Sequence, residues 1–227
     1  MTFDRLFDPN AMLLVLGGTI AATLLRSGPV DIAHAARALR GLFRRRFSGD
    51  RERGALATQV QHIKRDGLLR APLAKIADKD LSDAVGAMLQ RQSVDALIEH
   101  HDERRARRER VAGDATRLFY LAADLAPVFG LAGTLIALTQ LPVGGLAPKA
   151  ISGVVSAAVL TTLYGVLSAN LLFAPLGRQI ARVCEQEERE RQEAIDWLKA
   201  QIGSQATAAP TPTRFVPGSR STRMQAA

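Results

Sequence analysis

The chain has 227 residues, of which 47% are hydrophobic and 23% are charged, and its formal net charge is +8. Its single cysteine, Cys184, excludes an internal disulfide and a cysteine-rich metal site. His100 and His101 are adjacent, and neighbours on a helix point about 100° apart, which makes the pair a poor metal chelate. We therefore expect neither a metal nor a cofactor.

The first apolar block, Ala11–Leu25, has 15 residues, a length that alone is ambiguous. A signal peptide would need a basic leader and a small-residue cleavage site before a secreted domain. The leader Met1–Asn10 is instead slightly acidic, and a strongly basic segment follows the block. We therefore predict a first transmembrane helix over residues 11–26.

Residues 27–117 form a long charged segment whose patterns indicate helices. Val30 to Phe43 places its apolar side chains on one helical face. Asp80 to Arg117 contains no proline and continues directly into the next apolar block, which predicts one long helix leaving the membrane.

Two further apolar blocks lie close together. Residues 118–141 contain one charged residue, Asp124, and residues 150–177 contain none, so both are long enough to cross a bilayer. The segment between them, 142–149, is rich in proline and glycine and reads as a tight turn. Two spans joined by so short a turn must form an antiparallel hairpin.

The C-terminal region divides into a helix and a tail. Residues 178–202 combine spaced apolar side chains with Glu–Arg pairs four residues apart, which predicts an amphipathic helix. Residues 203–227 are dominated by Thr, Ser, Pro, Ala and Gly, a composition typical of a disordered tail.

The distribution of charge orients the chain in the membrane. Arg26 to Arg117 holds 20 Lys or Arg against 13 Asp or Glu, whereas Met1–Asn10 and Pro142–Lys149 carry one basic residue each. The positive-inside rule then makes the loop and C-terminus cytoplasmic, and the N-terminus and turn periplasmic. The arginine runs lack interleaved aromatics, so no nucleic-acid partner is expected. The predicted fold is all-α, an integral membrane protein with three transmembrane helices, a large helical cytoplasmic loop and a cytoplasmic C-terminal helix.

Small and hydroxylated residues recur at helical spacing in the hairpin. They are Ala158, Thr162, Gly165 and Ala169 on the third span, and Gly130, Thr134 and Ala137 on the second. Such rows can simply allow close helix packing, or they can form a weakly polar face that accepts a partner helix. Asp124, near the predicted cytoplasmic end, is read as an interfacial acid, so an ion path here would need a titrating group from a partner.

Two stretches of the hairpin resemble the MotA/TolQ/ExbB proton-channel family, and its flagellar-motor MotA branch in particular. They are "APVFGLAGTLIALTQL" (Ala126–Leu141) and "AVLTTLYGVLSANLLFAPLGRQI" (Ala158–Ile180). The opening "LLVLGGTIAATLL" (Leu13–Leu25) and the loop element "IKRDGLL" (Ile63–Leu69) are also similar to MotA-like sequences.

The resemblance implies a pentamer of this subunit around two copies of a single-span MotB-like or TolR/ExbD-like partner, in the bacterial inner membrane. The partner's membrane aspartate would carry the ion, and the ring would turn around the partner dimer. Pro127 and Pro175 match the family's two prolines, Thr134 its "GT" threonine, and Thr162 the threonine facing the ion path. A charged cluster in the MotA loop engages a rotor protein, and the corresponding region here contains Glu99, Asp102, Glu103, Arg104 and Arg105.

The chain departs from the MotA pattern in its number of spans. MotA proteins usually have four, and the match begins at the second of them, whereas three is the TolQ/ExbB number. The leading interpretation is an ion-channel subunit, with protons favoured over sodium, of a MotA-like stator. The alternatives are a TolQ/ExbB-type energiser of outer-membrane transport or envelope integrity, and a non-conducting membrane scaffold. The chain lacks a phosphate-binding loop, a nucleophile elbow and a catalytic constellation, so we do not expect an enzyme.

Overall fold

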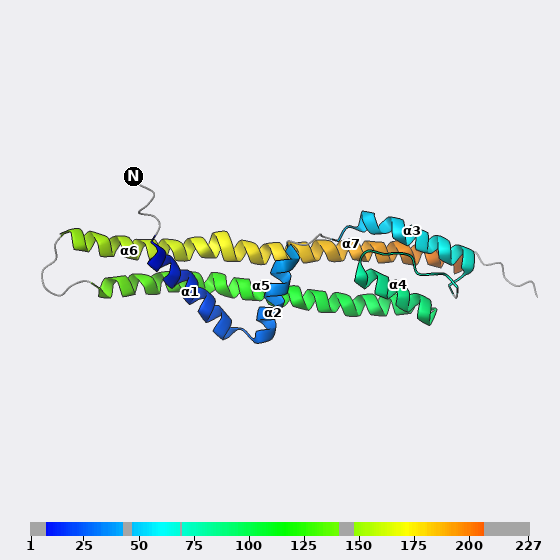
Figure 1. Cartoon of the computed structure of the whole chain (residues 1–227), viewed down its shortest axis with the longest axis horizontal. Helices are drawn as coiled ribbons and strands as arrows, with labels where there is room; N and C mark the ends of the chain where they lie inside the picture. Colours follow the sequence, from blue (N-terminus) through cyan, green and yellow to red (C-terminus); the bar gives the residue numbers. More distant parts are fainter. Residues whose placement is uncertain (1–7, 43–46, 69, 141–147, 207–227) are drawn as a thin grey trace, which may run out of the picture.

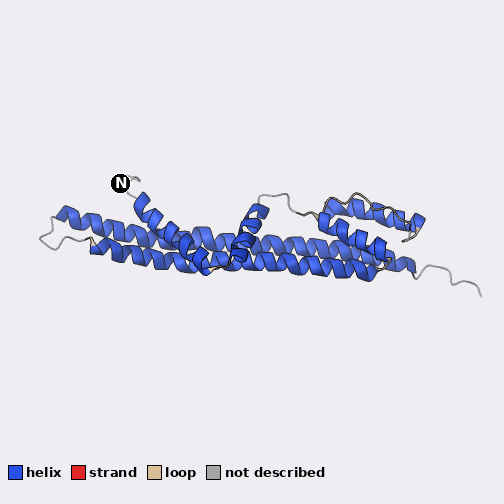
Figure 2. Cartoon of the chain, turned by 60° about the horizontal axis from the view of Figure 1, so that its bottom comes forward, coloured by secondary structure: helices blue, strands red, loops and turns tan. Residues whose placement is uncertain are grey.

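The computed structural model describes residues 8–42, 47–68, 70–140 and 148–206. The regular elements of these residues are all helices, and no strand occurs among them, which confirms the all-α fold class (Figure 2). The elements are α1 (Pro9–Arg26), α2 (Pro29–Leu42), α3 (Gly49–Asp66), α4 (Lys79–Arg91), α5 (Val94–Thr139), α6 (Pro148–Leu167), the π-helix η2 (Ser168–Phe173) and α7 (Ala174–Ala206).

Two long antiparallel rods form the axis of the molecule (Figure 1). One is α5, whose 46 residues extend for about 70 Å, and the other is the continuous run of α6, η2 and α7. In Figure 1, α1 and α2 cross the rods near their middle, whereas α3 and α4 lie beside their far end. The loop predicted from the sequence therefore folds back along the rods as three short helices.

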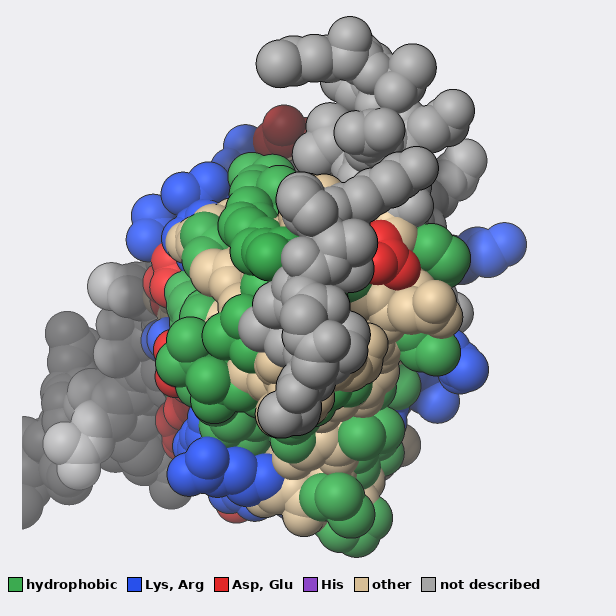
Figure 3. Space-filling view, turned by 90° about the vertical axis from the view of Figure 1, so that its left-hand side faces the viewer, with side chains coloured by type: hydrophobic (Ala, Val, Ile, Leu, Met, Phe, Trp, Pro, Cys, Tyr) green, Lys and Arg blue, Asp and Glu red, His purple; other side chains and the backbone are tan. Residues whose placement is uncertain are grey.

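Three helices are long and apolar enough to cross a membrane, as predicted: Pro9–Arg26, a part of Val94–Thr139 and a part of Ile151–Gly203. Large apolar side chains cover their outer surfaces, and Leu131, Val159 and Leu171 are 60%, 61% and 72% exposed. Figure 3 views the end that carries these spans, and hydrophobic side chains make up much of its described surface. Such a surface requires lipid or other chains around it.

The hairpin of α5 and α6 is packed backbone to backbone at two glycines. A Cβ atom on Gly165 would lie 2.7 Å from the carbonyl oxygen of Ala126 and 3.0 Å from Cα of Gly130. A Cβ atom on Gly130 would lie 2.9 Å from the carbonyl oxygen of Thr161. Because no side chain larger than hydrogen fits at either position, the small residues bring the two helices into direct contact.

Helix α1 lies against one side of this hairpin. Its buried side chains, Ala11, Val15, Thr19 and Thr23, recur every four residues and so share one face. The Thr19 and Thr23 hydroxyls donate to the carbonyl oxygens of Val15 and Thr19 at 2.6 and 2.7 Å, so neither polar group is left unpaired in an apolar contact.

A separate hydrophobic core lies at the far end of the rods, where α3 and α4 pack on α5 and α7. Its fully enclosed members are Leu56, Val85, Met88, Leu97, Ile195 and Leu198. The segment between α3 and α4 is held to α3 by side chains, since Gln59 accepts from the Ala74 amide at 2.7 Å and Glu52 from the Ala77 amide at 3.1 Å. The large loop thus has its own packed core.

Two sequence predictions differ from the structure. The single helix predicted over Asp80–Arg117 is wrong, because α4 ends at Arg91 and Gln92 takes a left-handed conformation with φ 54°. Ser93 then caps α5, accepting from the Asp95 amide at 3.1 Å, and the reversal lets α4 pack back on α5. Helix α7 also extends to Ala206 instead of ending at Ile202. The predicted periplasmic turn up to Ala147 and the tail after Ala206 lie outside the described residues.

The glycine contact predicts a position-specific cost. Gly165→Ala adds a Cβ atom that meets three backbone atoms, so we expect it to destabilise the folded protein by about 1–3 kcal/mol. Unfolding of the purified protein in detergent, followed by circular dichroism, measures the loss. Gly153→Ala in the same helix is the control, because its Cβ would meet nothing within 4 Å and should leave stability unchanged or raised. Equal effects of the two changes would contradict the close crossing.

Candidate functional site

The face of the hairpin opposite α1 is the candidate site in the membrane. Two contacts define the covered face, because Phe129 packs on Gly18 of α1 and the Tyr164 hydroxyl accepts from the Asp8 amide at 3.0 Å. At about 100° per residue, Pro127 lies about 160° around α5 from Phe129, and Thr162 about 160° around α6 from Tyr164. Both side chains are therefore on the side that α1 leaves open, and Thr162 is exposed.

Five of the six predicted ion-path residues divide into two groups in the single chain, and the sixth, Ala158, is half-buried between them in α6. Gly130, Gly165 and Ala169 lie in the contact between α5 and the second rod, where Ala169 packs in a buried cluster with Ala126 and Phe173. Thr134 and Thr162 instead lie at or near the open surface. The free polar surface thus depends on the two threonines, and the glycines act by bringing their helices together.

The three threonines at the crossing differ in their surroundings. Thr161 is buried against Gly133 and donates to the carbonyl oxygen of Ala158 at 2.8 Å. Thr162 is exposed, and its hydroxyl reaches the same half-buried Ala158 carbonyl at a longer 3.4 Å. Thr134 donates to the Leu131 carbonyl at 2.6 Å. A hydroxyl that donates to a backbone carbonyl keeps its oxygen lone pairs, so Thr134 and Thr162 can still accept a hydrogen bond from water or from a protonated carboxyl group.

The two predicted coupling prolines differ in their local structure. Pro127 is within α5 and exposed, and its Cα would lie 3.2 Å from a Cβ atom on Gly165. Pro175 follows η2, where the Ala174 amide bonds the Ala169 carbonyl five residues back. Because proline has no N–H, the carbonyl one turn before Pro175 loses its usual donor, and the wider π-helix accommodates that break.

Sequence reasoning did not identify η2 or the exposed Asn170 inside it. The Asn170 side-chain amide donates to the Val166 carbonyl at 3.0 Å, which leaves its oxygen as a further acceptor on the exposed surface of the second rod. The only signal in the sequence was the spacing of Pro175 from this uncharged stretch. A proline indicates an irregularity, but it does not distinguish a kink from a π-helix.

Asp124 is the only ionisable acid of the two hairpin spans, residues 118–140 and 151–177. It is exposed and lies three residues before Pro127, toward the end of the span that carries the charged segment. The crossing itself therefore offers hydroxyls and carbonyls but no carboxyl group.

The sequence matches the model of the MotA/TolQ/ExbB proton channel family over residues 68–193, which is more than half of the chain. The chain belongs to this family. The match includes the α5–α6 crossing, Pro127, Pro175 and both threonines of the open face.

The individual relatives to which the chain is similar include motility and chemotaxis proteins. The chain is 25% identical over 202 residues to the chemotaxis protein PomA of Vibrio alginolyticus, covering 85% of this chain and 77% of PomA. A shorter stretch of 81 residues, 35% of this chain and 30% of the relative, is 41% identical to motility protein A of Borreliella burgdorferi. The fold is shared with the flagellar MotAB stator complex of Bacillus subtilis, with a TM-score of 0.78 at 22% identity over 96% of this chain and 88% of that one.

A cluster of buried ion pairs joins the rods at the cytoplasmic end of the sequence-predicted topology. Glu188, 5% exposed, accepts from Arg108 at 2.9 Å and from Arg191 at 3.2 Å. Arg108 also donates to Asp80, and Arg191 to Asp78 at 3.2 Å, so both arginines link α7 or α5 to the N-terminal end of α4. Burial would lower the pKa of Arg108, but its hydrogen bonds and the charges of Glu188 and Asp80 raise it overall.

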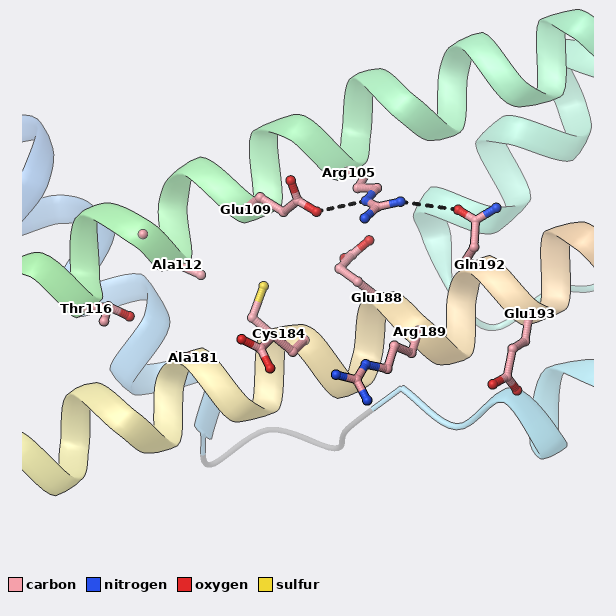
Figure 4. Close-up of a pocket in the computed structure, with 12 residues that line it drawn as sticks. Arg105, Glu109, Ala112, Thr116, Ala181, Cys184, Glu188, Arg189, Gln192 and Glu193 are labelled. Carbon is pink, nitrogen blue, oxygen red and sulfur yellow. Dashed lines mark hydrogen bonds and ion pairs between the residues drawn. The ribbon is translucent and has the colours of Figure 1, made fainter.

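The five loop residues predicted to contact other proteins lie along one stretch of α5. Glu99 pairs with Arg91 at 2.8 Å, and Arg104 pairs with Asp83 at 3.4 Å, so both belong to contacts with α4. Asp102 and Glu103 are exposed and form no ion pair with a described residue. Arg105 donates to Glu109 at 2.8 Å and reaches Gln192 of α7 at 3.5 Å (Figure 4).

The groove in Figure 4 lies between α5 and α7 and has a volume of about 560 Å³. Cys184 points into it from α7, and burial followed by the nearby carboxylates of Glu188 and Glu109 raises the pKa of its thiol. A thiol with a raised pKa is a poor nucleophile. The half-buried Cys184 therefore has an environment that disfavours its thiolate form.

The ion-pair cluster predicts a large effect of one arginine. Arg191→Ala leaves the buried Glu188 with a single partner and removes the link to Asp78, so we expect a loss of about 3–5 kcal/mol in the free energy of unfolding. Chemical denaturation in detergent measures it. Arg189→Ala is the matched control, because Arg189 is exposed and forms no ion pair with a described residue. A loss as small as that of the control would show that the cluster contributes little.

His101 predicts how the same end responds to acid. Burial, followed by the charge of Arg108, lowers the pKa of His101 below its ordinary value of 6.5. Between these two pKa values the unfolded chain binds a proton that the folded chain does not, so stability falls as the pH drops below about 6.5. Comparing denaturation at about pH 7.5 and about pH 5.5 measures this fall. We expect His101→Gln to show a smaller fall than the wild type, and an unchanged pH dependence would refute the assignment.

Proposed function

We propose that the chain is the ion-channel subunit of a MotA-like stator, which couples ion flow to mechanical work through an aspartate of a partner protein. The observation that supports this proposal most is the open face of the α5–α6 hairpin. On that face Thr134 and Thr162 present hydroxyl groups, and no carboxyl group lies beside them. Membership of a proton channel family and the fold shared with MotAB complexes support this reading.

The partner would be a single-span, MotB-like helix packed against the open face. Hydroxyl groups exposed to lipid are stabilised when another helix or confined water covers them. Five copies of this hairpin around two partner helices would enclose both aspartates in a ring of Thr162 side chains. A proton is the ion favoured by the family, and hydroxyl ligands are compatible with sodium as well.

The chain would lie in the bacterial inner membrane with its C-terminus in the cytoplasm. Arg26 and Arg117 flank the predicted spans of α1 and α5 and bound the net basic segment that contains α2 to α4, and the positive-inside rule assigns that side to the cytoplasm. The N-terminus and the turn between α5 and α6 would then be periplasmic.

Coupling would use the continuity of the two rods. Pro127 and Pro175 interrupt the hydrogen-bond ladders next to the crossing, so a change at the partner aspartate can bend the spans at these points. Because α5 and α7 continue without a break to the far core, the bend would move Asp102, Glu103 and their neighbours. These side chains, with Glu99, Arg104 and Arg105, are the proposed contacts to a rotor protein.

A TolQ/ExbB-type energiser is the second candidate, because the described residues contain three span-length helices and the family includes both kinds of machine. Its partner would lack a peptidoglycan-binding periplasmic domain, and the neighbouring reading frame distinguishes the two. A non-conducting scaffold, the third reading, would use the small residues for packing alone.

The proposed channel role predicts that Thr162→Leu reduces ion-driven work or ion flux at least about tenfold, since a bulky apolar side chain removes a hydroxyl acceptor and fills the open face. Flux is measured in proteoliposomes that contain the chain and the partner encoded beside it, and motility or transport is measured in cells. Thr162→Ser should retain most of the activity because the hydroxyl remains.

Val159→Leu is the matched control, because Val159 is 61% exposed one turn earlier in α6 and remains apolar after the change. A normal ion flux through the Thr162→Leu variant would contradict the proposed channel role. Altered assembly of Thr162→Leu without a specific loss of ion coupling would favour the scaffold.

A further inference from the structure

A second groove, with a volume of about 680 Å³, lies beside α5 and α7 between α2 and the start of α4. In Figure 1 this is the stretch of the rods between the labels α2 and α4. Five arginines line it: Arg37 from α2, Arg104, Arg107 and Arg108 from α5, and Arg191 from α7. Only three carboxylates share the lining, those of Asp80, Glu187 and Glu188.

The three carboxylates are already bound by three of the arginines. Asp80 pairs with Arg108 and, at 3.7 Å, with Arg104. Arg191 pairs with Glu187 at 3.4 Å and with Glu188 at 3.2 Å. These ion pairs join α4, α5 and α7 along one side of the groove.

The other two arginines of the groove, Arg37 and Arg107, do not pair with these carboxylates. Both are exposed, both line the groove, and neither forms an ion pair with any residue that the structure describes. They come from different helices, and α2 is fixed to α5 by a 2.8 Å contact between His34 and Asp114. Two guanidinium groups therefore line a groove whose carboxylates are already paired with other arginines. Each guanidinium offers planar N–H donors that suit an oxyanion.

We propose that this groove binds a phosphate-bearing anion, with Arg37 and Arg107 as its ligands. Arginine binds phosphate by paired, charge-assisted hydrogen bonds, and the groove has the volume of ordinary small-molecule sites. The phosphate can come from a soluble metabolite or from an anionic lipid headgroup, because α2 packs on Ala115 and Ile180, close to where the apolar spans end. The site is independent of the proposed ion path.

The test uses the full chain in nanodiscs of neutral phosphatidylcholine. In one arm, inorganic pyrophosphate is titrated at constant ionic strength. In the other, part of the lipid is replaced by phosphatidylglycerol. We expect a saturable rise of the unfolding temperature in at least one arm, and at least about tenfold weaker binding in the Arg37→Gln/Arg107→Gln double variant. The responding arm identifies the source of the phosphate.

The matched control is Arg110→Gln/Arg182→Gln, which removes the same charge from exposed arginines of α5 and α7 outside the groove. It should bind like the wild type. An equal loss in this control would overturn the proposal, because it would show general charge attraction, and so would the absence of a response to both probes. Should the double variant not fold, the two single variants carry the same comparison.

Discussion

The backbone contact between Gly130 and Gly165 is the constraint on which the rest of the structure depends. A Cβ atom at either position would meet backbone atoms at 2.7–3.2 Å, so α5 and α6 can approach this closely only because both positions are glycine. In lipid no hydrophobic force drives two apolar helices together, and close packing has to do so. The crossing then sets which side chains remain outside it. Thr161 is turned inward, and Thr162, one residue later, is turned to the open face.

The two ends of the rods are stabilised by different physics. Around the crossing, polar groups are hydroxyls and amides that satisfy themselves on their own backbone, as Thr19 and Asn170 do. At the far end, full charges are buried as hydrogen-bonded clusters, with Glu188 held by two arginines. Removing one partner of such a cluster is costly because it leaves an uncompensated buried charge. Helix α7 joins this end directly to the π-helix η2 and Pro175 in the membrane-spanning part of the chain.

Much of this arrangement could be predicted from the sequence. Uncharged length and the short turn predicted the three spans and the hairpin, and the spacing of Gly130 and Gly165 predicted close helix packing. Which side of the α5–α6 hairpin stays open could not be predicted, because it depends on where α1 packs. The position of α1 is decided by contacts such as that of Phe129 with Gly18. The break at Gln92 was missed since glutamine carries no turn signal, and the left-handed residue is stabilised by the packing of α4 rather than by propensity. The ion-pair cluster joins residues over 100 positions apart, such as Asp78 and Arg191, which no local pattern connects.

The crossing of α5 and α6 around Gly130 and Gly165 carries no carboxyl group, and Asp124, the one acid of residues 118–140 and 151–177, lies toward the end of its span. This arrangement has a physical rationale. A charged residue at the centre of a single membrane helix costs about 2.5–3.5 kcal/mol on insertion. A hairpin that carried its own acid would bear that cost five times in a pentamer, and would place like charges near one another. If the acid belongs to a partner, the hairpin inserts as a neutral element, and only the few partner helices carry a charge. Thr134 and Thr162 are then sufficient, because a hydroxyl accepts and donates hydrogen bonds without being charged. In the proposed assembly, this insertion cost would be the reason why the hairpin is neutral and close-packed while the partner carries the charge.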